Sequence, residues 1–252
     1  MQTLVNKVLK AHRFLASQLL YPIVLSTVLA GILFTARVFF SRSLTYDNLV
    51  WNLFLAWIPY IFSAWAALLF ISNRQRWWLL VIPGMMWLIF FPNAPYIVTD
   101  FFHLVDRPHI PLWFDIIMLA TFAWTGLFIA IASLRTMQIL VKSYLGWFLS
   151  WIFAGIALGL GGLGIYLGRF SRWNSWDLFT QPKEILYDIA IRFVHPLSNL
   201  RFFGFTFLFS AFLLVCYLTF ISVRRVNEPS FYSRNDAKRK NLTKTNPEYN
   251  LN

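Results

Sequence analysis

Cysteine and charged residues are scarce in this chain. It has one cysteine, Cys216, among 252 residues, and 13% of its residues are charged, against about 25% in an ordinary soluble domain. A single cysteine excludes an intrachain disulfide and a cysteine-based zinc site. With 58% hydrophobic residues, the chain has too few polar groups to cover the surface of a water-soluble domain. The composition therefore favours a protein whose outer surface faces lipid.

Acidic residues are scarcer than basic ones: ten Asp and Glu stand against 22 Lys and Arg, and the formal net charge is +12. In a soluble protein this excess would suggest nucleic acid as a partner. Here the basic residues lie in loops and tails between apolar runs, so no soluble domain presents a basic face. We predict no nucleic-acid partner, and we expect the positive charges to set the orientation in the membrane.

Long apolar runs are abundant. Each has roughly 20 residues, enough at about 1.5 Å per residue to cross a hydrocarbon core of about 30 Å. The runs are apolar on all sides, whereas the strands of a membrane β-barrel alternate. The six runs are 19–40, 50–71, 77–98, 114–134, 145–167 and 202–223. The sequence therefore predicts an all-α polytopic bundle of about six transmembrane spans over residues 19–223.

Polar, basic segments flank the predicted bundle. Residues 1–18 are predicted to form a cytoplasmic N-terminal segment, and residues 224–252 a disordered cytoplasmic tail. With both termini in the cytoplasm, that side holds three basic residues before the first span, two in each of two short loops and seven after the last span. The short loops then follow the positive-inside rule.

The segment before the last span predicts an amphipathic helix. Pro182 suits the start of a helix, and Lys183, Glu184, Asp188 and Arg192 share one helical face. Such a helix would lie on the membrane surface or pack against the bundle.

The third run ends in Pro92-Asn93-Ala94-Pro95-Tyr96, followed by Asp100 and His103. Two prolines three residues apart predict a broken or kinked helix. Broken helices often line sites in membrane proteins, although a helix terminus with turn chemistry explains the pattern as well. Asp100 and His103 would share a helical face, and an aspartate can orient an imidazole as a base or a ligand.

Two further residues of the same types, Asp106 and His109, follow that segment. Their spacing matches no zinc signature, and Pro108 would interrupt a helix. We predict a solvated polar loop and no metal site, and the sequence leaves the cofactor unknown.

Arg169 and Arg172 stand three residues apart at the end of the fifth run. Two guanidinium groups on one face suit a phosphate or a carboxylate, although arginines at this depth also reach lipid headgroups. Asn174 and Asp177 resemble a capping box. Asp115, at the start of the fourth run, suits the positive end of a helix dipole.

Under the predicted topology these polar residues converge on the extracytoplasmic side of the membrane. Polar groups at this level are costly, so function is their first hypothesis. The set is Asn52, Asn93, Tyr96, Asp100, His103, Asp115, Arg169, Arg172, Asn174 and Asp177.

Glycines crowd the fifth run, beginning with Gly155-x-x-x-Gly159. Small residues let helices approach closely, either within the chain or in an oligomer. Gly159-x-Gly161-x-x-Gly164 matches a dinucleotide fingerprint in letters only, because no strand precedes it.

Several of these segments resemble one family. They are Leu53-Phe54-Leu55-Ala56-Trp57-Ile58-Pro59, Phe91-Pro92-Asn93-Ala94-Pro95-Tyr96, Trp113-x-Asp115 and Gly168-Arg169-x-x-Arg172-x-Asn174-Ser175-Trp176-Asp177. The chain is similar, over about residues 45–220, to an uncharacterised bacterial multi-pass membrane family, domain of unknown function 1361. The resemblance implies a bacterial cytoplasmic membrane and a shared fold, and it brings no activity.

The sequence thus predicts an integral membrane protein of unknown activity, with three hypotheses for its role. As an enzyme at the outer interface, it would act on a lipid-linked or anionic substrate. His103 would serve as base, oriented by Asp100, with Asp115 or Asp177 as partner acid. Arg169 and Arg172 would hold the anionic group, and Asn93, Tyr96 and Asn174 would complete the binding site. The alternatives are a small-molecule transporter and a non-catalytic scaffold or assembly factor.

Overall fold

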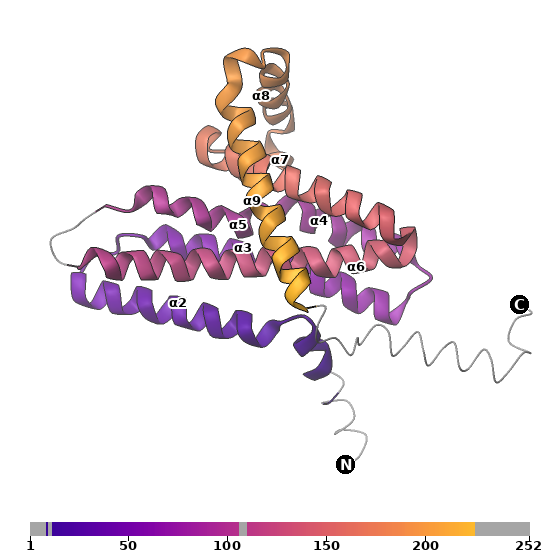
Figure 1. The fold of residues 1–252 in the computed structure, drawn as a ribbon, viewed down its shortest axis with the longest axis horizontal. Coiled ribbons are helices and arrows are strands. Elements are labelled where there is room, and N and C mark those ends of the chain that lie inside the picture. Colours follow the sequence, from indigo (N-terminus) through magenta and orange to yellow (C-terminus); the bar gives the residue numbers. More distant parts are fainter. Residues whose placement is uncertain (1–8, 10–11, 106–109, 225–252) are drawn as a thin grey trace, which may run out of the picture.

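The structure is a computed structural model that describes residue 9 and residues 12–105 and 110–224. Asp106 and His109, and the predicted tail beyond Arg224, lie outside the described residues. The chain is helical along most of its described length (Figure 1). The elements are α2 (Leu20–Ser41), α3 (Asp47–Ser72), η1 (Trp77–Leu80), α4 (Val81–Phe90), α5 (Asn93–Tyr96), η2 (Ile97–His103), α6 (Leu112–Tyr166), η3 (Leu167–Ser171), α7 (Asp177–Thr180), α8 (Pro182–Val194), η4 (Leu197–Asn199) and α9 (Leu200–Arg224).

Five helical stretches among the described residues are long and apolar enough to cross a membrane: Leu20–Ser41, Asp47–Ser72, Trp77–His103, Leu112–Ser171 and Leu197–Val223. The fourth is too long for one crossing, because the 55 residues of α6 would extend for about 80 Å at about 1.5 Å per residue. Gly146 interrupts it with φ 84° and ψ 179°, a conformation open to glycine because it has no Cβ. The ribbon of α6 reverses direction part-way along its length (Figure 1). The arms before and after Gly146 therefore give two of the six crossings among the described residues.

The third span bends at its prolines, as predicted. The α-helical hydrogen bonding of α4 ends at Phe90, and the chain continues through the short α5 and the 3-10 turns of η2. Pro92 and Ile97 keep right-handed helical φ and ψ values, so the chain bends without leaving the helical region. Missing proline N–H groups account for the change of hydrogen-bonding pattern.

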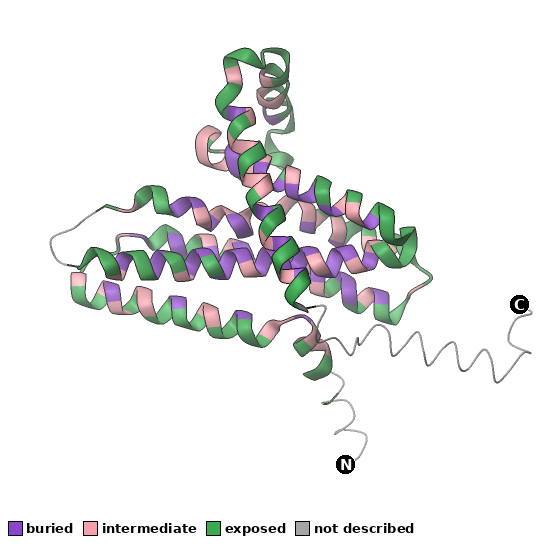
Figure 2. Ribbon diagram, viewed as in Figure 1, coloured by how far each residue is buried: buried purple, intermediate pink, exposed green. Residues whose placement is uncertain are grey.

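The core of the bundle lies along α6, which packs against α2, α3, α5 and α9. In its most apolar 18-residue window 67% of residues are buried, against 17% for α2 and for α9. Figure 2 shows buried residues along α6 and exposed ones on the outer side of α2. Because these exposed side chains are mostly large and apolar, the outer surface suits contact with lipid tails.

Glycines of the second arm of α6 allow close helix packing. A Cβ on Gly164 would lie 2.6 Å from Cγ of Pro92, and one on Gly161 would lie 3.0 Å from the ring of Phe91. Gly155 and Gly159 differ, because a Cβ on either would meet nothing within 4 Å. Close packing is therefore confirmed for the glycines toward the end of this arm, and the Gly155-x-x-x-Gly159 pair is not used between helices of the described chain.

The helix predicted before the last span is α8, and it begins at Pro182. Its Ile185 is buried beside Tyr166, Leu167 and Phe202, so α8 packs against the end of the bundle. Other apolar side chains of α8 remain exposed, including Leu186. In Figure 1, α8 and the beginning of α9 extend beyond the other long helices.

Candidate functional site

Asp100 joins three spans through its carboxylate. The side chain is 1% exposed in η2. Its Oδ2 accepts a hydrogen bond of 2.8 Å from Nδ2 of Asn52 in α3, and its Oδ1 lies 3.5 Å from Nη1 of Arg169 in η3. A carboxylate buried at this depth needs such partners, because desolvating an unpaired charge costs several kcal/mol. The Asn52–Asp100–Arg169 network therefore stabilises the packing of these three segments.

Arg169 directs its guanidinium group into the protein. Nη2 donates a 2.5 Å hydrogen bond to the carbonyl of Thr99, and Nη1 donates one of 3.4 Å to the hydroxyl of Tyr96. The guanidinium carbon also lies 5.6 Å and 5.4 Å from the ring centroids of Tyr96 and Phe102. These contacts and the ion pair with Asp100 use the Nη1 and Nη2 groups of Arg169, which the sequence predicts to bind an anionic substrate.

Arg172 lies apart from Arg169. It is exposed, and its φ of 62° is left-handed, so it ends the π-helical turn of η3. Arg169 is therefore largely buried and paired, whereas Arg172 is exposed beyond the helical turn. The joint use of the two guanidinium groups for an anion stays a prediction.

His103 ends η2 with its side chain exposed. Its backbone carbonyl accepts a 3.1 Å hydrogen bond from the hydroxyl of Tyr46. The Asp100 carboxylate accepts a side-chain hydrogen bond from Asn52. The orientation of the His103 imidazole by Asp100 stays a prediction.

Asp115 is paired with Arg37, a residue that the predicted site did not include. The Nε–Oδ1 and Nη2–Oδ2 distances are 2.8 Å and 3.3 Å, and the two side chains are 1% and 2% exposed. The guanidinium also donates to the carbonyl of Thr45 at 3.3 Å and lies 4.6 Å from the ring centroid of Tyr46. The sequence carries a signal for this pair, because Arg37 is an isolated arginine inside the apolar run 19–40. A charged residue in such a run implies a buried partner of opposite charge.

The loop after η3 is ordered by local polar contacts. Oδ2 of Asp177 accepts hydrogen bonds from the backbone N–H of Asn174 at 2.7 Å and from its side chain at 3.3 Å. The bond from the Asn174 N–H is one of the two contacts of the predicted capping box. The α-helix itself begins later, at Asp177, with Trp176 as its N-cap and no side-chain cap hydrogen bond. The hydroxyl of Ser175 donates to Oδ1 of Asn93 at 3.3 Å and ties the loop to α5.

A cavity of about 170 Å³ lies between this loop, α3, α5 and the second arm of α6. Four of its lining residues are aromatic, and the polar ones are amides or a hydroxyl. The lining residues are Trp51, Asn52, Leu55, Ile89, Pro92, Asn93, Tyr96, Gly164, Leu167, Gly168, Trp173, Asn174, Ser175, Trp176, Leu178 and Ile185. Nδ2 of Asn93 is buried and has no hydrogen-bond partner among the described residues. The cavity thus brings together Asn52, Asn93, Tyr96 and Asn174 of the predicted set.

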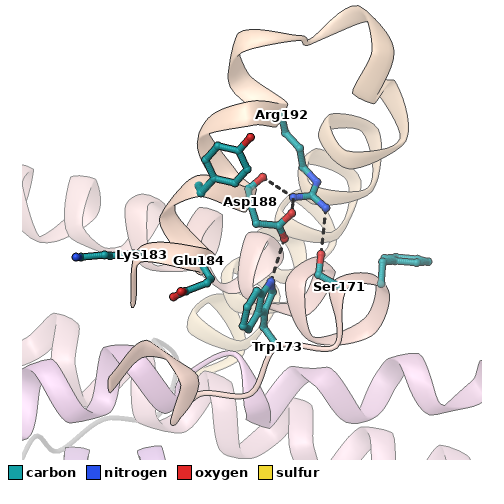
Figure 3. Close-up of a pocket in the computed structure, with 8 residues that line it drawn as sticks. Ser171, Trp173, Lys183, Glu184, Asp188 and Arg192 are labelled. Carbon is teal, nitrogen blue, oxygen red and sulfur yellow. Dashed lines mark hydrogen bonds and ion pairs between the residues drawn. The ribbon is translucent and has the colours of Figure 1, made fainter. Parts of the chain in front are cut away.

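A second, more open hollow of about 630 Å³ adjoins the cavity and shares Trp173 with it (Figure 3). Asp188 and Arg192 form an ion pair there. Trp173 Nε1 donates to Asp188 Oδ2 at 3.0 Å, and Arg192 Nη2 donates to the Ser171 hydroxyl at 3.1 Å. We call this hollow the α8 groove. Figure 3 shows Lys183 apart from the ion pair.

The charge of Asp188 is stabilised within the α8 groove. Burial alone would raise the pKa of Asp188, but hydrogen bonds from Arg192, Trp173 and Ser171 outweigh it, so that the pKa lies below its ordinary value. The i,i+4 spacing of Asp188 and Arg192 on a predicted helix was the signal for this pair. Its contacts with Trp173 and Ser171 depend on tertiary structure.

These features define the class of protein: a multi-pass α-helical membrane protein with a cavity of aromatic, aliphatic and amide side chains at one end of its spans. The family model described as "Protein of unknown function (DUF1361)" matches residues 51–216, and the chain belongs to that family. The resemblance found in the sequence is thereby confirmed. No curated protein and no solved structure matches the chain.

Proposed function

We propose that this protein binds the polar headgroup of a lipid or lipid-linked molecule in the cavity between α3, α5 and the 173–178 loop. The observation that carries the proposal is the Nδ2 group of Asn93, which is buried without a hydrogen-bond partner among the described residues. It lies at a cavity that four aromatic side chains help to line. A buried unsatisfied donor costs about 1–3 kcal/mol, and an acceptor on a bound headgroup would remove that cost.

The size and position of the cavity support a headgroup as the ligand. At about 170 Å³ it is smaller than the roughly 300–1,000 Å³ of a pocket for a drug-sized molecule. Trp51 and Trp176, which line it, are also partly exposed, and tryptophan favours the level of lipid headgroups. A headgroup could enter the cavity while the acyl chains remain in the surrounding lipid.

The Asn52–Asp100–Arg169 network would then position the cavity wall. Asn52 and Tyr96 both line the cavity, and each also contacts the network, Asn52 through Asp100 and Tyr96 through Arg169. Holding these side chains in one rotamer reduces the entropy lost on binding. In this proposal Asp100 and Arg169 are positioning residues.

The topology that we propose places the cavity on the extracytoplasmic side of a bacterial inner membrane, with both termini in the cytoplasm. The distribution of basic residues supports this orientation. Single cysteines at Ser175 and Ser143, in a Cys216→Ser chain, would be labelled in intact cells with a membrane-impermeant thiol reagent. Labelling at position 175 and not at 143 is expected, and the reverse pattern would invert the topology.

Lipid retention tests the binding proposal. The protein is purified in mild detergent, and bound lipids are detected by native mass spectrometry in the wild type, Ser175→Trp and Ser143→Trp. The indole at position 175 should fill the cavity and remove a retained lipid, whereas position 143 lies near the Gly146 turn, is exposed and provides the matched control. Equal lipid retention in all three proteins would refute the proposal.

A further inference from the structure

The chemistry of the cavity walls indicates the class of headgroup, and this step rests on the proposed function. We infer that the headgroup is uncharged and rich in hydroxyl groups, as a sugar ring is, rather than a phosphate. The inference follows from three features of the lining: its charge, its hydrogen-bonding groups and its aromatic faces.

The described lining of the cavity carries no Asp, Glu, Lys, Arg or His side chain. Charged side chains contact the lining residues without lining the cavity themselves. Asp100 and Arg169 pair with each other behind Asn52 and Tyr96. Asp177 accepts from Asn174, and Asp188, which is paired with Arg192, accepts from Trp173. A buried phosphate needs arginine or lysine partners, or a set of aligned N–H groups, to offset its desolvation. A neutral ligand carries no such penalty, so the uncharged lining favours it.

The polar groups of the lining suit hydroxyl groups. A side-chain amide has both hydrogen-bond donors and an acceptor, and a hydroxyl group can pair with either because it both donates and accepts. Asn93 provides an unused buried donor at Nδ2, while its Oδ1 already accepts from Ser175. Asn52 and Asn174 add two further amides to the same wall, and their Nδ2 groups already donate to Asp100 and Asp177.

The aromatic residues supply flat apolar faces beside these amides. Trp51, Tyr96, Trp173 and Trp176 all line a cavity of about 170 Å³. A sugar ring has C–H groups on its faces and hydroxyl groups around its edge, so it can contact indole rings while hydrogen-bonding to amides. Diacylglycerol has one free hydroxyl, so it offers the lining fewer hydrogen-bonding groups than a sugar ring with several.

The neighbouring α8 groove provides an internal contrast. Lys183, Glu184, Asp188 and Arg192 line it, so charged side chains are concentrated there and absent from the described cavity wall. Any phosphate-binding contribution should therefore depend on Lys183, whereas binding in the cavity should depend on Asn93 and Ser175.

The test presents the purified full-length protein with an equimolar mixture of three lipids that have identical acyl chains. These are monoglucosyl diacylglycerol, diacylglycerol and phosphatidic acid. Bound species are counted by native mass spectrometry. We expect the glucosyl lipid to dominate in the wild type and in Lys183→Gln. Asn93→Leu should weaken its binding roughly tenfold, which corresponds to about 1.4 kcal/mol for one lost hydrogen bond.

Ser175→Trp provides a second variant that acts by filling the cavity, and it should abolish the preference even if Asn93→Leu fails to fold. A preference for phosphatidic acid that Ser175→Trp removes would overturn the inference and leave the proposed function standing. A glucosyl-lipid preference lost in Lys183→Gln but kept in Ser175→Trp would place recognition in the groove and overturn it as well. Lipid binding insensitive to both cavity variants would overturn the inference and the proposed function together.

Discussion

Separating Arg37 from Asp115 should be one of the most destabilising single changes in this protein. The pair joins α2 to the start of α6 through two hydrogen bonds, and both side chains are almost fully buried, at 1% and 2% exposed. In Asp115→Leu the guanidinium group stays buried and keeps contacts with Thr45 and the Tyr46 ring, neither of which carries a compensating charge. The variant therefore leaves a cation unpaired inside the bundle.

The magnitude follows from the burial of the pair. Removing one partner of a buried ion pair costs about 3–5 kcal/mol, because the remaining charge loses its compensation. Asp115→Leu should lie toward the upper end, since arginine cannot release its proton in a protein. Arg37→Met leaves the buried Asp115 carboxylate without its partner and should fall in the same range. The double variant Arg37→Met/Asp115→Leu should return to within about 1 kcal/mol of the wild type, since an apolar replacement of a buried pair is often neutral.

The assay is reversible unfolding in mixed micelles of a mild detergent and sodium dodecyl sulfate, followed by circular dichroism. Arg42→Met provides the matched control, because Arg42 is exposed just after α2. Arg42→Met should change the free energy of unfolding by no more than about 0.5 kcal/mol. If the double variant were as unstable as the sum of the two single variants, the residues would contribute independently, and the argument from charge compensation would be refuted.

Two further outcomes follow from the structure. Gly164→Ala places a methyl group 2.6 Å from Pro92 Cγ and should lower the free energy of unfolding by about 1–3 kcal/mol in the same assay. Gly155→Ala, which meets open space, should stabilise α6 by up to about 1 kcal/mol, and equal effects of the two alanines would contradict the packing argument. Because the pKa of Asp188 lies below its ordinary value of about 3.9, the carboxylate stabilises the fold above that value, and this contribution is lost as pH falls through the folded pKa. The protection factors of the α8 amides, which correct for the pH dependence of intrinsic exchange, should therefore fall below about pH 4 in the wild type, whereas Asp188→Asn should already show the lower protection at pH 7.

The spans could be predicted closely because the bilayer imposes a local rule. The runs 50–71 and 202–223 correspond to α3, Asp47–Ser72, and α9, Leu200–Arg224, with ends within about three residues. Apolarity and length alone identify such helices. Residues 135–144, by contrast, were treated as a loop, and they continue α6 as far as Gly146. This segment has no glycine or proline to stop it, and Met137 and Leu140 belong to the buried core.

The region of the candidate site was predictable, but its pairings were not. Local spacing suggested an interaction between Asp100 and His103, which are three residues apart. A side-chain hydrogen bond joins Asp100 to Asn52, 48 residues away. Such partners depend on how spans pack, and no periodic pattern in one sequence encodes that packing. The cavity itself arises where the 173–178 loop returns over α5, and this path is equally non-local.

Asp100 and Asp115 are both predicted as catalytic groups, and the structure gives each a partner from another helical segment. These partners are Arg169 and Arg37 respectively. A charge that is already paired and buried adds rigidity to a bundle but offers little to a ligand. The groups left to contact a ligand are amides and indole rings, residue types that a search for catalytic motifs does not rank highly. The Asp100–Arg169 pair, whose residues the sequence places in an active site, instead lies behind Asn52 and Tyr96 and supports the wall of the cavity that we propose for a neutral headgroup.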